Sequence, residues 1–193
     1  MKIYDFTSEQ KRIKINYALS KEEIALLQDG DIILRHGYGF VSDAITTTLK
    51  EDVSHCAILV KDDNSFKVIH SVSQSLSDYD GVQTQGLKRF INDSKLNSVI
   101  VLRYKFKEND DRTLISQRAR HYLDMQVSFD NSFDINDSTE FFCSELLWKV
   151  FLDAYNIDIF EDKYGKDNRE FLKFDVFQNP KYFELVFSHQ TKN

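Results

Sequence analysis

The chain has 193 residues, which suits one domain of ordinary size and is too few for two. It is 41% hydrophobic and 13% aromatic, so it can build a substantial core without disulfides or metal ions. Its 31 acidic residues outnumber its 25 basic ones, and this net charge of −6, with no local run of Lys and Arg, argues against nucleic-acid and anionic-membrane partners.

The hydrophobic pattern predicts the secondary structure in chain order. Ser20-Lys21-Glu22-Glu23 is a capping box that begins a short helix ending before Gly30. Apolar runs and helical spacings then predict strands over 31–35, 54–61, 66–72, 99–104 and 182–187, and helices over 41–50, 110–124 and from about 143. We therefore predict an α+β fold, in which helices flank a small, largely antiparallel sheet. Residues 1–28 form an N-terminal extension with a short helix, and residues 29–193 form a single domain.

Neither a signal-peptide core nor a run of about 20 apolar residues occurs. These patterns predict a cytoplasmic protein without a transmembrane segment. Cys56 and Cys143 are too few for a disulfide scaffold and are expected to be reduced thiols. The oligomeric state is not indicated.

The first chemical candidate is Cys143. Polar residues 138–140 precede it, and an apolar-periodic helix follows it, so its thiol is expected in the first helical turn. Free N–H groups and the positive end of the helix dipole stabilise a thiolate there, and the thiolate is the nucleophilic form of cysteine. The alternative is that Cys143 is a small buried hydrophobic residue, as free cysteines commonly are.

Two histidines are expected to share one face of the sheet. A two-residue turn at Asp62-Asp63 would set His55 directly opposite His70, and a turn one residue later would make them diagonal neighbours. A loop with an odd number of residues would instead place the two histidines on opposite faces of the sheet. On one face, His55 would take the thiol proton and His70 would orient its ring. The alternative is two half-buried strand histidines.

The remaining candidates indicate no metal site. His36, His121 and His189 lack a second histidine and are expected to be surface or structural residues. Residues 130–137 resemble a calcium loop but lack its central glycine. Cys56 should point to the opposite face from its neighbour and belong to the core. We expect no metal and no cofactor.

Four runs resemble a known family: GDIILR at 30–35, SHCAILV at 54–60, FDxxF at 129–133 and FCSELLWK at 142–149. Their order resembles the YiiX-like group of the circularly permuted, NlpC-type, papain-like superfamily of cysteine hydrolases. The resemblance implies a circularly permuted papain-like core, with His55 as the catalytic histidine and Cys143 as the nucleophile. The third position, His70, is a carboxylate in many YiiX-like members and a histidine in the related lecithin retinol acyltransferase group.

At three positions this sequence differs from the family pattern, and the differences concern packing and contact with substrate. Ala57 replaces a glycine, and Phe129 and Phe142 replace tyrosines. These two phenylalanines, together with Arg35 and Tyr38 on a glycine-flanked loop after the first strand, are the candidate substrate-binding residues. We expect the carboxylate of Glu145 to interact with the helix dipole at the start of the helix, and not to transfer protons.

These observations predict a cysteine-dependent hydrolase or acyltransferase with a Cys-His-His triad that forms an acyl-enzyme. Its substrate would be a small molecule, a peptide amide or a lipid-like acyl compound. The alternative is a binding module for lipids or peptides that keeps the fold without turnover, and a purely structural role is a third possibility.

Overall fold

The structure is a computed structural model that describes residues 17–63, 65–107, 110–165 and 173–190. Its strands are β1 (Ile32–Arg35), β2 (His55–Asp62), β3 (Ser65–Val72), β4 (Gly81–Gly86), β5 (Ile100–Tyr104) and β6 (Phe183–Ser188). Its helices are α1 (Lys21–Leu26), α2 (Phe40–Leu49), α3 (Leu87–Asn92), α4 (Leu114–Asp124), α5 (Cys143–Tyr155) and α6 (Glu161–Tyr164), with a 3-10 helix, η1 (Phe174–Gln178). The predicted strands and the predicted helices are therefore present.

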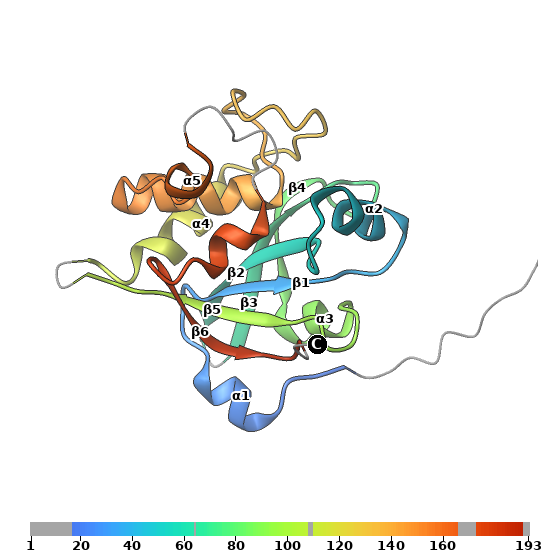
Figure 1. Cartoon of the computed structure of the whole chain (residues 1–193), viewed down its shortest axis with the longest axis vertical. Coiled ribbons are helices and arrows are strands. Elements are labelled where there is room, and N and C mark those ends of the chain that lie inside the picture. The colour runs from blue at the N-terminus through green and yellow to red at the C-terminus, as the bar shows by residue number, and fades with distance from the viewer. Residues whose placement is uncertain (1–16, 64, 108–109, 166–172, 191–193) are drawn as a thin grey trace, which may run out of the picture.

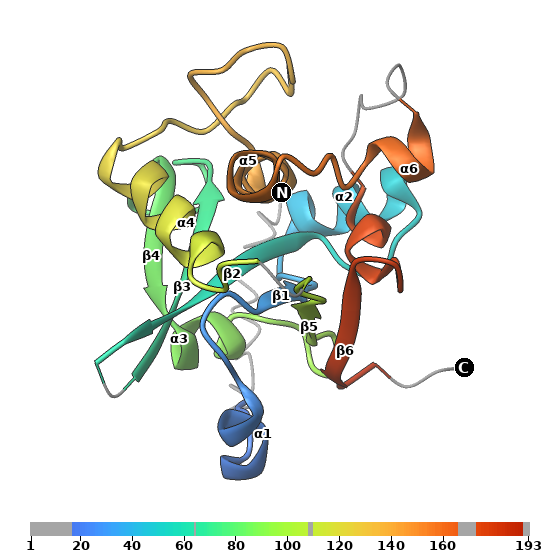
Figure 2. The same cartoon turned by 90° about the vertical axis from the view of Figure 1, so that its left-hand side faces the viewer.

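The six strands form one antiparallel sheet in the order β4-β3-β2-β1-β5-β6. Figures 1 and 2 show α4 and α5 on one side of this sheet, and α1 and α3 on the other. The predicted α+β class, with a small antiparallel sheet flanked by helices, is confirmed. Among the described residues, no helix has both the length and the apolar character needed to cross a membrane.

Strand β2 is buried on both faces, and its side chains alternate between two cores. Cys56, Ile58 and Val60 belong to the core that the central helix α5 covers. Ala57 and Leu59 belong to the core on the α3 side, where Phe90 packs. Neighbouring residues of β2 therefore serve different layers of the molecule.

The β2–β3 hairpin has the second of the two predicted registers. Asp62 pairs with Ser65 and Ile58 with Ile69, which makes His55 and His70 diagonal neighbours. Within the described residues, the pairing of β2 with β3 stops at Ile58↔Ile69, although each strand continues to pair with its other neighbour. The two strands therefore separate at the end of the hairpin that lies away from its turn.

The chain before α5 docks next to this separation. Ser71 Oγ on β3 donates a buried hydrogen bond of 2.5 Å to the carbonyl oxygen of Phe141. The Phe141 N–H group in turn donates to the carbonyl oxygen of Ser128 at 2.9 Å. These bonds fix the start of α5 beside the sheet.

A buried ion pair secures the opposite end of β1. Arg103 on β5 donates from Nε and Nη2 to the two carboxylate oxygens of Asp31, each at 2.8 Å. Asp31 is 1% exposed, and its other neighbour Gln28 donates a backbone N–H bond to it. This bidentate geometry compensates for the cost of burying the carboxylate.

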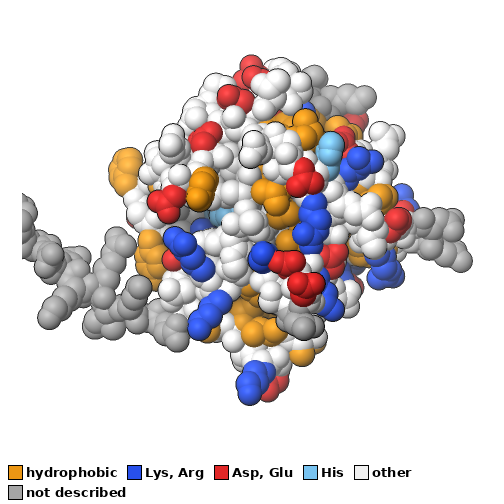
Figure 3. Space-filling model, turned by 180° about the vertical axis from the view of Figure 1, so that it is seen from behind, with side chains coloured by type: hydrophobic (Ala, Val, Ile, Leu, Met, Phe, Trp, Pro, Cys, Tyr) orange, Lys and Arg blue, Asp and Glu red, His pale blue; other side chains and the backbone are white. Residues whose placement is uncertain are grey.

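The hydrophobic pattern predicted no element between residues 73 and 98, where the structure has β4 and α3. Strand β4 is an edge strand with exposed polar positions such as Thr84, so its sequence lacks an apolar run. Acidic and basic side chains are interspersed on the face in Figure 3, in keeping with the overall charge balance.

Candidate active site

His55 and His70 form the centre of the site. His55 is the first residue of β2, and its Nε2 lies 2.8 Å from Nδ1 of His70 in β3. The two rings meet edge to face, with centroids 5.1 Å apart. Since His55 uses Nε2 in this bond, its Nδ1 is the nitrogen left for a reacting group. His70 Nε2 is buried without a hydrogen-bond partner.

Phe90 on α3 encloses both imidazoles. Its ring centroid lies 5.9 Å from that of His55 and 5.6 Å from that of His70. Burial, followed by the charge of Arg35, lowers the pKa of His70 to about 3. Burial also holds the pKa of His55 well below its usual value, with further contributions from His70 and Arg35. Both rings are therefore neutral at neutral pH.

Arg35 is the cation of the site. It is the last residue of β1, directly before the loop that carries Tyr38, and its register partner on β2 is His55. Its Nη1 donates to the carbonyl oxygen of Phe90 at 2.8 Å, and its guanidinium carbon lies 4.0 Å from the centroid of the Phe90 ring. Burial lowers the pKa of Arg35 to about 10, and its Nε is buried without a partner.

Cys143 begins α5, as predicted, and its side chain is partly exposed. The pKa of its thiol is lowered, chiefly by a hydrogen bond from the Cys56 thiol, and the backbone N–H groups of Cys56, Ser144 and Cys143 itself add to this against the effect of burial. The polar residues 138–140 that precede Cys143 in the sequence do not cap the helix, because its N-cap residue is Phe142. Backbone N–H groups and the neighbouring thiol stabilise the thiolate instead.

Cys56 is fully buried in the core beneath α5, on the opposite side of β2 from the Phe90 side, which confirms its predicted place. Burial and the neighbouring Cys143 raise the pKa of its thiol. The sequence did not predict that its thiol would meet that of Cys143. The structure thus brings His55 to His70 and Cys143 to Cys56, and the peptide bond between residues 55 and 56 joins the two pairs. A direct hydrogen bond from Cys143 to His55 is not among the contacts of these described residues.

Glu145 lies in the first turn of α5 and is completely buried. One carboxyl oxygen accepts the N–H group of Phe142 at 3.4 Å, and the other has no hydrogen-bond partner. Burial raises the pKa of Glu145 to about 8, with Lys149 opposing the shift and Asp130 supporting it. The carboxyl group thus lies at the start of α5 and accepts the N–H group of its N-cap residue, and the expected role of Glu145 at the helix dipole stays a prediction.

The predicted substrate-binding aromatics differ in exposure. Tyr38, in the loop after β1, is 48% exposed, whereas Phe142 is only 4% exposed. Phe142 packs on Phe133, with centroids 5.2 Å apart, and Phe133 packs on the partly buried Phe129 at 6.2 Å. These rings form a cluster in the segment that leads to α5.

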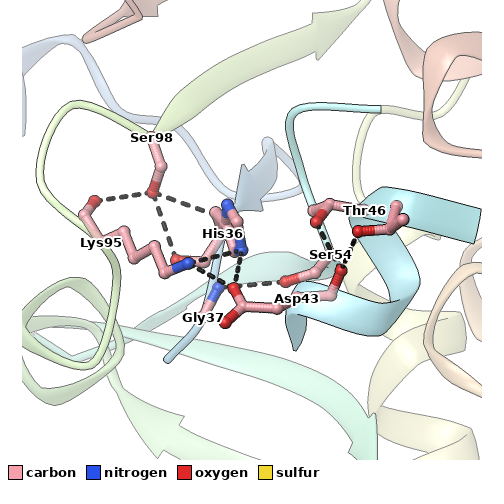
Figure 4. A network of polar contacts seen from close by, with 8 residues as sticks. His36, Gly37, Asp43, Thr46, Ser54, Lys95 and Ser98 are labelled. Atoms are coloured by element: carbon pink, nitrogen blue, oxygen red, sulfur yellow. Dashed lines mark hydrogen bonds and ion pairs between the residues drawn. The ribbon is translucent and has the colours of Figure 1, made fainter. Parts of the chain in front are cut away.

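A polar network anchors the loop that carries Tyr38 (Figure 4). His36 Nε2 lies 3.1 Å from a carboxylate oxygen of Asp43 on α2 and 3.0 Å from Nζ of Lys95, and Lys95 also pairs with Asp43. Ser54 Oγ accepts the N–H group of Gly37 at 3.0 Å. His36 is thus structural, as predicted, and the network holds this loop beside the start of β2.

Comparison with known proteins identifies the family. Residues 26–188 match the family described as permuted papain-like amidase enzyme, YaeF/YiiX, C92 family. The chain belongs to this family. The predicted resemblance to the YiiX-like permuted papain-like group is confirmed, and membership implies a cysteine peptidase or amidase. Among curated proteins, no significant match exists.

A solved member of the YiiX group supports the fold. The crystal structure of metalloprotein yiiX from Escherichia coli O157:H7 matches with a TM-score of 0.67 and 21% identity, over 85% of this chain and 98% of that one. That relative is described as a metalloprotein. In the part of this permuted papain-like chain that the structure describes, no three His, Cys, Asp or Glu side chains gather to hold a metal ion. We derive no step that uses a metal.

Proposed function

We propose that this chain is a cysteine amidase that cleaves an amide bond through an acyl-enzyme on Cys143. The hydrogen bond of 2.8 Å between His55 and His70 is the observation that carries this proposal. It leaves His55 Nδ1 available as a base. Arg35, the register partner of His55 on β1, interacts with the charge of Cys143, which supports placing the thiol near this histidine.

In the proposed mechanism, His55 Nδ1 accepts the proton of Cys143 as the sulfur attacks the substrate carbonyl carbon. The Nε2–H group of His55 donates to Nδ1 of His70, which keeps the proton-accepting nitrogen turned towards the thiol. Backbone N–H groups at the start of α5 stabilise the oxyanion. His55 then protonates the leaving amine, and water releases the acid from Cys143.

Arg35, Tyr38 and Phe129 are our candidates for holding the substrate. Arg35 lies against the two imidazoles, close enough to interact with the charge of Cys143. Its buried guanidinium would attract a carboxylate near the scissile amide. Tyr38 would contact the substrate from the anchored loop. Because Phe142 is almost fully buried, we propose that it supports the wall of the site from behind.

The test is hydrolysis of a panel of acyl donors by the purified chain. Amide, thioester and ester donors with the same acyl group, each with and without a carboxylate near the scissile bond, would be compared in wild type and Cys143→Ala. We expect amide turnover that disappears in Cys143→Ala, and a trapped acyl-enzyme on Cys143 with a slowly hydrolysed donor. Transfer of the acyl group to an added amine instead of water would identify an acyltransferase. Turnover unchanged in Cys143→Ala would refute the thiol mechanism.

A second function is favoured by the low pKa of His55. A histidine whose pKa lies well below its usual value is a weak base, which is also consistent with a module that binds a peptide or lipid-like acyl compound without cleaving it. Saturable binding of the donors without product, together with a Cys143 thiol that resists alkylation, would support this function. A cytoplasmic location remains a prediction.

A further inference from the structure

We propose that Ser71 is a positioning residue that sets where Cys143 lies relative to the histidine pair. Ser71 follows His70 directly on β3 and is 0% exposed. Its hydroxyl group donates to the carbonyl oxygen of Phe141 at 2.5 Å, two residues before the first residue of α5. The effect of this bond on amide cleavage rests on the proposed function, whereas its effect on the place of the helix does not.

The alternation of side chains along β3 gives each face of this strand its own contacts. Val68 belongs to the core on the α3 side, where Phe90 packs against the ring of His70. Ile69 belongs to the core beneath α5, and Ser71 shares that face because it lies two residues further along the strand. The strand therefore holds the ring that orients the proposed base and, at the next position, the chain that leads to the proposed nucleophile.

A second attachment, from β4, holds the other end of the loop that precedes α5. The Val82 N–H group donates to the carbonyl oxygen of Val127 at 2.8 Å, and Val82 is the register partner of Ser71. The two ends of the loop are also bonded to each other, since the Phe141 N–H group donates to the carbonyl oxygen of Ser128 at 2.9 Å. The β3–β4 pair thus anchors both ends of this loop.

The approach of the loop to Gly81, the first residue of β4, leaves no room for a side chain. A Cβ atom on this glycine would lie 2.1 Å from the carbonyl oxygen of Val127 and 2.7 Å from the Cα atom of Ser128. Its φ of 78° is also one that residues with a side chain rarely adopt. Because the contact is with backbone atoms, no side chain can move aside, and the place of the loop on β4 is tightly set.

Loss of the Ser71 hydroxyl group would leave the carbonyl oxygen of Phe141 without this donor, in a residue that is only 2% exposed. The chain before α5 would shift, and the Cys143 sulfur would move relative to His55. A misplacement of about 1 Å can lower the rate of a reaction about 10²-fold. A loosened first helical turn would also stabilise the thiolate less, because its free N–H groups would no longer be held in line.

The experiment compares wild type with Ser71→Ala and Ser71→Thr, and uses Ser116→Ala as the matched control. Ser116 on α4 is 4% exposed, and its hydroxyl group donates to the carbonyl oxygen of Thr113 at 3.1 Å. The measurements are kcat and KM on the best amide donor, the pH profile of iodoacetamide labelling at Cys143 read by peptide mass spectrometry, and thermal unfolding.

In Ser71→Ala we expect kcat to fall about 10²-fold with little change in KM. The labelling profile of Cys143 should move to higher pH. Ser71→Thr keeps the hydroxyl group and should restore both readouts. Ser116→Ala should unfold at a lower temperature than wild type, with kcat and the labelling profile unchanged.

A folded Ser71→Ala with the kcat and labelling profile of wild type would overturn the inference, and so would equal changes in Ser116→Ala. If Ser71→Ala does not fold, Gly81→Ala disturbs the same loop from β4, and an unchanged labelling profile in that variant would overturn it. A profile that shifts in Ser71→Ala and returns in Ser71→Thr, in a chain without amide turnover, would uphold this inference while the proposed function fails. Turnover that requires Cys143 and is equal in wild type and Ser71→Ala would do the reverse.

Discussion

The imidazole of His55 is hydrogen-bonded to that of His70 across the β2–β3 hairpin, Nε2 to Nδ1 at 2.8 Å. This bond orients the first histidine and leaves one of its nitrogens for the thiol chemistry. In the mechanism that we propose, this pair of histidines serves the Cys143 thiol. The environment around the pair, above all Phe90 and Arg35, sets how it behaves with pH.

Replacing His55 with alanine should lower the rate of amide hydrolysis by about 10²- to 10⁴-fold, which is the usual contribution of a general base. The measurement is kcat/KM on the best donor of the panel, in wild type, His55→Ala and His121→Ala. His121 is an exposed histidine on α4 and serves as the control. An equal loss in both variants, or none in His55→Ala, would contradict the assignment.

His70 should make the fold less stable in acid. Its pKa is about 3 in the folded chain and near its ordinary value when unfolded, so the unfolded state binds the extra proton first. The free energy of unfolding should therefore fall as the pH drops from about 6.5 towards 3. In His70→Gln this part of the decline should be absent. Urea unfolding across that range gives the comparison, and parallel curves for the two proteins would exclude the effect.

Glu145 should have the opposite effect on the pH dependence of stability, so that the free energy of unfolding falls as the pH rises. Its pKa is raised from 4.5 to about 8 in the folded chain, so the folded state holds the proton over this interval. The contribution to stability is complete below pH 4.5 and is lost as the pH rises through about 8. Glu145→Gln, which cannot ionise, should gain on wild type by a few kcal/mol between pH 5 and 8, on the order of the linkage energy. Thermal unfolding at both ends of the interval tests this expectation.

Removing the Cys56 thiol should make Cys143 less acidic. The thiol is the largest stabilising influence on the Cys143 thiolate, so Cys56→Ala should move the pH profile of iodoacetamide labelling to higher pH. The variant Cys56→Ser keeps a hydrogen-bond donor, so its labelling profile should lie between those of wild type and Cys56→Ala. In wild type the labelling rate should rise in one step, because the neutral imidazoles supply no positive charge at rest. An unchanged profile in Cys56→Ala would remove Cys56 from the site.

The Asp31–Arg103 pair offers a stability test away from the site. Arg103→Leu leaves a buried carboxylate without its partner and should cost about 3–5 kcal/mol of unfolding free energy. Replacing both residues with apolar ones should lower the unfolding free energy by less, since no buried charge is then left without a partner. Equal losses in the single and double variants, measured by urea unfolding, would show that the pair is not coupled.

Much of this architecture could be predicted from apolar periodicity and turn chemistry. The strand containing His55, the hairpin and the helix beginning at Cys143 all have strong local patterns. The face shared by the two histidines followed from the even turn length, and the diagonal register was one of two stated possibilities. These features depend on residues close together in the chain.

The missed features depend on tertiary contacts. Strand β4 has half-buried Gln and exposed Thr positions, so its partner strand rather than its own composition makes it a strand. Phe90 could not be assigned to the histidines, because its helix was not recognised. The effect of Cys56 on the Cys143 thiol depends on the docking of α5 over β2, which no local sequence signal marks.

The early end of the β2–β3 pairing also determines the order in which the site can be assembled. The histidine hairpin closes over a short stretch of chain, whereas Cys143 reaches Cys56 only after a much longer loop is closed, at a higher entropic cost. Until α5 docks, its thiol lacks both the sulfur and the Cys56 N–H group that favour ionisation. Docking of this helix, and not closure of the hairpin, is therefore the step at which the pKa of the Cys143 thiol falls.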